Sequence, residues 1–159
     1  MAYKLRKRII MSVDLTKLNN IDGVGDSFIY SKSGALLIPQ LQYEDTRIAR
    51  LGREIALSAA LLERIRQEID FIELIYEDRR IIVRIAHDYF ILVICDNTAD
   101  FTLIKLTVNV INEGIKGSKD IQRLLRKSPE KKDLVTEAQN DSELKVLLEK
   151  MTIIAKKEG

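Results

Sequence analysis

Apolar residues gather in five short runs that are rich in β-branched and aromatic side chains and are separated by turn-sized polar gaps. These runs span residues 26–31, 35–38, 71–76, 81–86 and 90–95. The first two flank Lys32-Ser33-Gly34, which is typical of a hairpin turn, and Pro39 limits the second run and indicates a sheet edge. The last three predict an antiparallel meander. Because the final two are almost continuously apolar, we expect that part of the sheet to be covered on both faces.

Helical spacing of apolar residues predicts helices at about residues 13–20, 44–70, 100–114, 119–127 and 141–156. The longest helix carries two apolar stripes. The stripe expected to cover the sheet consists of Ile48, Leu51, Ile55, Ala59, Leu62 and Ile69. The second stripe, centred roughly 110° away, consists of Leu57, Leu61 and Ile65. A helix that is apolar on two faces must bury both, and the core is small, so we expect a partner chain to cover the second stripe.

Small residues recur at four-residue spacing on the same helix, at Gly52, Ala56 and Ala60. They let another backbone approach closely, and that backbone can belong either to the sheet or to a second helix. The uncovered second stripe favours the helix pair.

Two further apolar faces lie in the second half of the chain. Helix 100–114 carries a second stripe at Leu103, Leu106 and Val110. One face of helix 141–156 carries Leu144, Leu147, Leu148, Met151 and Ile154. We expect this terminal face to dock on the stripe of helix 100–114 or on a partner.

Composition narrows the class of protein. The chain has 159 residues, 46% of them hydrophobic, and this fits a soluble protein with one core. Its formal net charge of +2 is too close to zero for a typical nucleic-acid binder. A single histidine and a single cysteine argue against zinc and iron–sulfur sites, and the lone cysteine fits a reducing compartment. No apolar run approaches the roughly 18–20 residues of a membrane span. We expect a cytoplasmic protein with no cofactor and no enzymatic activity.

Three segments are expected along the chain. Residues 1–12 form a basic arm that contains Lys4 and Arg6 and no acid, and we expect it to be a solvated end. Residues 13–117 form the domain, and residues 118–159 form a helical extension in which the composition changes.

Each motif with possible chemistry has a simpler structural interpretation. Gly23-Val24-Gly25 precedes a strand and lacks a third glycine, so it predicts a turn and no dinucleotide loop. Gly114–Lys119 follows a helix and has the letters of a phosphate loop in the wrong order. His87-Asp88 falls in a hairpin turn without a nucleophile, and Cys95 ends an apolar strand as a small core residue. The acids Glu44 and Asp45 open a helix, where negative charge favours the helix dipole.

Several of these segments together resemble the Roadblock (dynein light-chain type) domain family. Ile21-Asp22-Gly23-Val24, the strand that ends at Tyr30-Ser31, and the Ser33-Gly34 turn are similar to the opening of that domain. Residues 80–95 resemble its paired central strands, and the likeness covers residues 13–116. The resemblance implies an α+β fold, a five-stranded antiparallel sheet between helices in the order α-β-β-α-β-β-β-α, with residues 118–159 as an addition.

The resemblance also implies a homodimer. Family members join edge strands and pair their long helices, which on this chain are residues 71–76 and 44–69. The expected dimer-interface residues are Leu57, Leu61, Ile65, Phe71, Glu73 and Ile75.

Many family members bind Ras-like small GTPases, some of them accelerating hydrolysis and others acting as scaffolds. The family has no fixed catalytic residue, and members that promote hydrolysis are thought to reshape the site of the GTPase itself. We therefore expect a non-catalytic regulator or scaffold that binds a Ras-like GTPase through the paired long helices. The expected polar rim of that contact consists of Arg47, Arg50, Arg53 and Glu54.

Other functions compete with this interpretation. The chain can be a structural adaptor subunit of a motor or signalling complex. A small-molecule sensor of the PAS or GAF type would need a cavity with convergent polar groups, and the strands are uniformly aliphatic. Nucleic-acid binding would depend on the basic ends alone, because the strands have no pattern of stacking aromatics, and we do not expect it.

Overall fold

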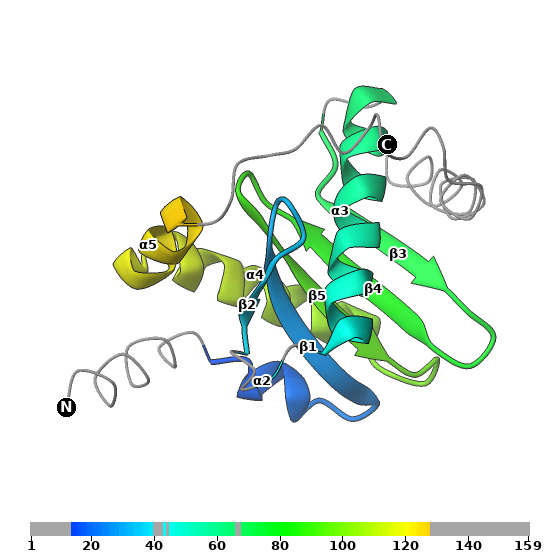
Figure 1. Ribbon diagram of the computed structural model, residues 1–159. Coiled ribbons are helices and arrows are strands. Elements are labelled where there is room, and N and C mark those ends of the chain that lie inside the picture. The colour runs from blue at the N-terminus through cyan, green and yellow to red at the C-terminus, as the bar shows by residue number, and fades with distance from the viewer. Residues whose placement is uncertain (1–13, 40–42, 44, 66–67, 128–159) are drawn as a thin grey trace.

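A computed structural model describes residues 14–39, 43, 45–65 and 68–127 (Figure 1). The order of helices and strands within these ranges is the order expected from the sequence, including the short helix expected at residues 119–127. In chain order they are α2 (Thr16–Asn19), β1 (Val24–Ser31), β2 (Leu36–Ile38), α3 (Thr46–Ile65), β3 (Phe71–Ile75), β4 (Arg80–Ile85), β5 (Tyr89–Cys95), α4 (Phe101–Lys116) and α5 (Lys119–Lys127). The expected helix 141–156 and basic arm 1–12 lie outside the described residues.

The five strands form one antiparallel sheet in the order β2-β1-β5-β4-β3. This arrangement confirms the α+β prediction of a five-stranded antiparallel sheet with helices. The strand next to Pro39, β2, is one edge of the sheet, as its proline predicted, and β3 is the other edge.

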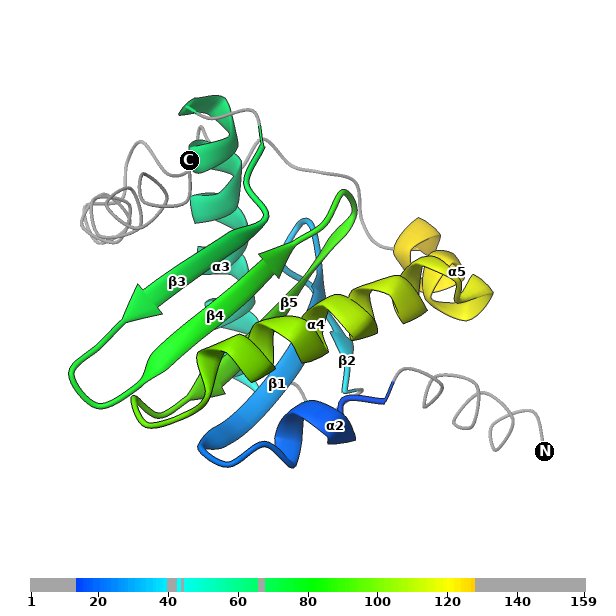
Figure 2. The same cartoon turned by 180° about the vertical axis from the view of Figure 1, so that it is seen from behind.

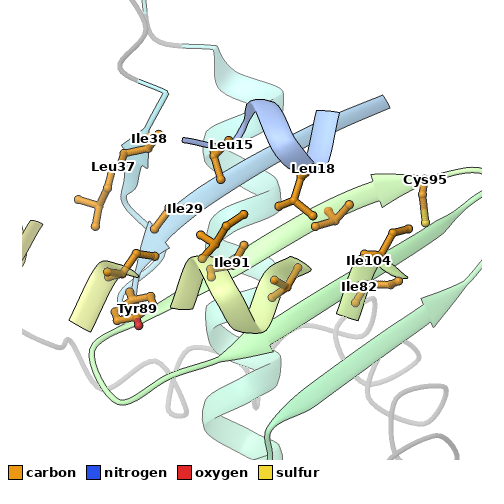
Figure 3. Close-up of a cluster of buried hydrophobic side chains, with 14 of the residues drawn as sticks. Leu15, Leu18, Ile29, Leu37, Ile38, Ile82, Tyr89, Ile91, Cys95 and Ile104 are labelled. Atoms are coloured by element: carbon orange, nitrogen blue, oxygen red, sulfur yellow. The ribbon is translucent and has the colours of Figure 1, made fainter. Parts of the chain in front are cut away.

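Each face of the sheet has its own hydrophobic core, so the prediction of a sheet covered on both sides is confirmed. On one face α3 packs through Ile55 and Leu62 against a cluster that includes Phe90 of β5. On the other face, α2 and α4 cover a second cluster that includes Leu18 and Ile104 (Figures 2 and 3). The short helix α5 adds buried Ile121 to this second cluster, so the beginning of the extension is part of the domain core.

The long helix is shorter than the sequence pattern predicted. The expected end at Asp70 is wrong, because residues 68–70 are not helical in the structure. The carbonyl oxygen of Asp70 instead accepts a hydrogen bond of 2.8 Å from the N–H of Ile85. This bond continues the β3–β4 ladder by one residue and draws Asp70 into the sheet.

The β1–β2 hairpin and α3 approach each other backbone to backbone at two glycines. Gly34 has φ of +92°, as its place in the turn predicted, and a Cβ atom there would lie 2.7 Å from the carbonyl oxygen of Gly52. A Cβ atom on Gly52 would clash with Cε1 and Cδ1 at the edge of the Tyr30 ring and would lie 2.6 Å from the carbonyl oxygen of Gly34. The Tyr30 hydroxyl donates a hydrogen bond to the carbonyl of Ile48 at 2.9 Å, which holds the first turn of α3 to β1. The close approach at Gly52 is therefore made within one chain, not by a second helix.

No described helix is long and apolar enough to cross a membrane.

Gly52→Ala is expected to lower the free energy of unfolding by about 1–3 kcal/mol, because a methyl group would overpack the contact with Tyr30. Gly114→Ala is the matched control, since a Cβ atom there has open space within 4 Å and alanine is the better helix former. We expect the control to be neutral or to add up to about 1 kcal/mol. Urea unfolding followed by circular dichroism measures both, and equal effects would contradict the proposed close packing.

Candidate protein-interaction surface

Among the residues that the structure describes, no strand pairs with the outer edge of β3, and main-chain groups lie unpaired along it. The N–H of Tyr76 donates to the carbonyl of Arg79 at 2.9 Å, and the N–H of Ile85 donates to that of Asp70 at 2.8 Å. The N–H and C=O groups of successive residues point to alternate sides of a strand, so the intervening residues 72 and 74 also form their hydrogen bonds with β4. The N–H and C=O groups of residues 71, 73 and 75 therefore point away from the sheet.

The same alternation sorts the side chains of β3 between the two faces. Ile72 and Leu74 are buried in the cluster under α3. Phe71, Glu73 and Ile75 lie on the α4 face, where Phe71 packs against the other cluster and Ile75 is 51% exposed.

One flank of α3 is directed toward the β3 side of the sheet. The ion pair between Lys32 and Glu63, 2.6 Å long, fixes the opposite flank of α3 at the β1–β2 hairpin. Burial raises the pKa of Tyr76, Arg79 lowers it, and the charge of Glu54 raises it. Glu54 therefore lies near Tyr76, the residue that follows β3. At about 100° per residue, Leu61 and Ile65 project within about 20° of Glu54. The expected second stripe thus lies on the β3 side of α3, which crosses the sheet in Figure 1.

Burial differs along that stripe. Ile65 is 70% exposed and Leu61 is half-buried, as a surface kept for a partner would require. Leu57 is only 4% exposed, so the expectation that it needs a partner chain to cover it is wrong. Leu57 is covered within the single chain, and the part of the stripe that is open to a partner is Leu61 and Ile65.

Glu73 is the centre of a charged cluster on the α4 face of β3. Its side chain is 13% exposed, Lys105 Nζ lies 2.5 Å from Oε1, and Arg80 Nη1 lies 3.9 Å from Oε2. The Arg80 guanidinium also lies 4.0 Å over the ring of Phe101. The sequence pattern indicated neither contact: Lys105 lies on a helix that is distant from β3 in sequence, and Arg80 reaches Glu73 across the β3–β4 hairpin. The only signal was a lysine beside the core-facing stripe of helix 100–114.

The four expected rim residues lie in the N-terminal half of α3. Arg47, Arg50 and Arg53 are exposed, and Glu54 is half-buried. Arg50 Nε donates to Glu54 Oε1 at 3.0 Å across one helical turn. This half of the helix is therefore charged, and it precedes the apolar flank formed by Leu61 and Ile65.

A second exposed apolar surface lies on α4. Leu103, Leu106 and Val110 are all exposed, so the expected second stripe of this helix is present in the structure. It faces away from the cluster under α4 that contains Ile104 and Val108.

The residues considered for catalysis take the structural roles expected of them. His87 is exposed in the β4–β5 turn, and its Nε2 lies 3.9 Å from Asp88 Oδ1. Burial raises the pKa of the Cys95 thiol. Among smaller effects, Arg80 lowers this pKa, and Asp96 and Glu73 raise it. Gly23, with φ of +89°, makes the turn into β1, and Gly114 lies within α4. Within the described ranges, no group of three or more potential ligands is placed to hold a metal ion.

Comparisons with known proteins identify the fold. No protein-family model matches the sequence, and no curated protein matches it either. The Roadblock/LC7 domain from Streptomyces avermitilis is similar in structure with a TM-score of 0.54 and 8% identity, over 65% of this chain and 92% of that chain. MglB from Myxococcus xanthus gives a TM-score of 0.54 and 21% identity, over 68% and 91%. The gliding protein MglB from Thermus thermophilus gives 0.52 and 15%, over 77% and 93%.

These similarities confirm the expected fold: the chain has the Roadblock/LC7 architecture. They cover most of each compared chain and about two thirds to three quarters of this one.

Cys95 is expected to be inert in the folded protein. Its side chain is buried, and the raised pKa of its thiol lowers the thiolate fraction at neutral pH. A thiol reagent such as Ellman's reagent should react with it at pH 8 only after urea unfolds the protein. Rapid reaction in native buffer would contradict a core role for this residue.

Proposed function

We propose that this protein is a homodimer that acts as a non-catalytic platform for a Ras-like small GTPase. The observation that carries the proposal is the juxtaposition of an open edge strand, β3, with the apolar flank of α3 formed by Leu61 and Ile65. The Roadblock/LC7 architecture supports it, because the resemblance noted from the sequence implies dimers made from these same two elements.

A second copy of the chain supplies what both elements lack. An edge strand with free main-chain groups invites pairing with another strand. A large aliphatic side chain such as Ile65 contributes roughly 1.5–3 kcal/mol when it leaves water. Joining two β3 strands side by side brings two α3 helices together on one face, so strand pairing and helix packing form a single interface.

The two paired α3 helices then form the platform. Their outer surface carries the charges of Arg47, Arg50, Arg53 and Glu54, which form a polar rim beside the apolar seam where Leu61 and Ile65 of the two copies meet. The surface lies on the two-fold axis, so one GTPase that straddles it binds with a stoichiometry of one per dimer. The GTPase supplies its own nucleotide site, and this chain contributes a shaped surface.

Leu61→Glu combined with Ile65→Glu is expected to give a monomer, because two carboxylates would be buried against their copies in the helix pair. Light scattering coupled to size exclusion, at micromolar concentration, measures the mass. Leu106→Glu with Val110→Glu is the matched control, since both are exposed apolar positions on a helix of the opposite face, and it should remain a dimer. A monomeric wild-type chain would overturn the proposed dimer.

Arg50→Glu with Arg53→Glu is expected to weaken GTPase binding at least tenfold while the protein stays dimeric. Candidate Ras-like GTPases, loaded with GDP or with a GTP analogue, are titrated into the dimer by calorimetry, which also gives the stoichiometry. Arg126→Glu, an exposed charge reversal on α5, serves as the control and should bind like the wild type. Binding that survives the double charge reversal would remove this surface from the platform.

A further inference from the structure

The main-chain direction of β3 restricts how a second copy can pair with it, and this inference rests on the homodimer proposed above. In an antiparallel pair, residues that exchange hydrogen bonds face each other with their main-chain groups. Residues 71, 73 and 75 have theirs directed outward, because residues 70, 72, 74 and 76 pair with β4. A second β3 must therefore place its own residues 71, 73 and 75 opposite these three.

The side chains discriminate among the allowed registers. In the central register, Glu73 faces its own copy and Phe71 faces Ile75 twice, which gives three facing pairs that each exchange two hydrogen bonds. Sliding one strand by two residues in either direction leaves two such pairs within the strand. The slide also sets Leu74 opposite Asp70, or Phe71 opposite Glu77, so apolar residues meet charges.

The central register also covers the exposed apolar surface of the strand. Ile75, which is 51% exposed, would pack against the ring of Phe71 of the second copy. Pairs of an aromatic and a β-branched side chain are favoured across strands. On the other face, Ile72 meets Leu74 of the second copy and extends the cluster under α3.

The cost of this register is a pair of carboxylates facing each other, and like charges directly opposite destabilise a sheet. The cluster around Glu73 removes that cost. Lys105 Nζ lies 2.5 Å from one carboxylate oxygen and Arg80 Nη1 lies 3.9 Å from the other, so each glutamate enters the interface with two cations of its own chain. We propose that Glu73 stands opposite its own copy at the two-fold axis, and that Lys105 and Arg80 set this register by neutralising the pair.

Cysteine cross-linking tests the register. In a Cys95→Ala background, Glu73→Cys should form a disulfide-linked dimer on mild oxidation, because facing residues of a hydrogen-bonded pair have Cα atoms about 5.5 Å apart. Phe71→Cys and Ile75→Cys should not cross-link alone, since each would lie roughly 13 Å from its copy along the strands. Their mixture, in which Glu73 is unchanged, should give a cross-linked heterodimer. A disulfide in Ile75→Cys or Phe71→Cys alone would overturn the central register.

A double-mutant cycle tests the neutralisation. Lys105→Met should raise the dimer dissociation constant at least fivefold, and adding Glu73→Gln should recover most of that loss. Lys116→Met is the matched control on the same helix, because its partner Glu113 lies one turn away on α4, and it should leave the constant unchanged. The same substitutions in the monomeric Leu61→Glu, Ile65→Glu background measure by urea unfolding how much of the effect belongs to the single chain.

The outcomes separate the two proposals. A wild-type monomer contradicts the dimer and with it the platform. If the wild-type chain is a dimer and Lys105→Met has no effect, the neutralising role of Lys105 is contradicted and the dimer stands. The same holds if the double variant dimerises as weakly as Lys105→Met.

Discussion

The central strands of this sheet are apolar on both sides, and the rest of the architecture follows from the need to cover them. In β5, Phe90 and Leu92 face one core, while Ile91 and Val93 face the other. Neither face can be left in water, so α3 occupies one and α2 with α4 occupy the other. Once the two faces are covered, the main-chain groups of the edge strand β3 and one flank of α3 are left over. The proposed dimer surface is made of these two elements.

The position of α3 is set by the glycine contact with the hairpin, far from the surface it serves. Gly34 and Gly52 let the first half of the helix approach the sheet backbone to backbone, and Tyr30 anchors that end. The ion pair of Lys32 with Glu63 fixes the rotation of the second half. Because the distance of α3 from the sheet and its rotation about its own axis are both fixed, Ile65 projects toward the open edge of β3. Residues far from the proposed dimer surface thus orient the side chains that would form it.

Local pattern was sufficient to predict the strands, the hairpin and the edge position of β2, since each depends on neighbours in sequence or on a proline. The pattern failed where distant segments decide. The end of α3 was placed too late, because the pairing of Asp70 with Ile85 ends the helical stretch and no periodicity reports it. Leu57 was expected on the exposed stripe, and its burial depends on the folded chain. The contact between Glu73 and Lys105 joins a strand to a helix more than two dozen residues later and was equally invisible.

A charge at the middle of an edge strand has two opposite effects on association. It discourages unspecific pairing, because an incoming strand must bury a carboxylate, and inward-facing charges are a common protection of open edges. The same charge becomes acceptable when it is paired with cations of its own chain and the incoming strand brings main-chain groups in phase and apolar neighbours on both faces. A second copy of this chain offers all of these at once. In the proposed dimer, Glu73 therefore separates a second copy of this chain from the many other strands that an open edge would accept.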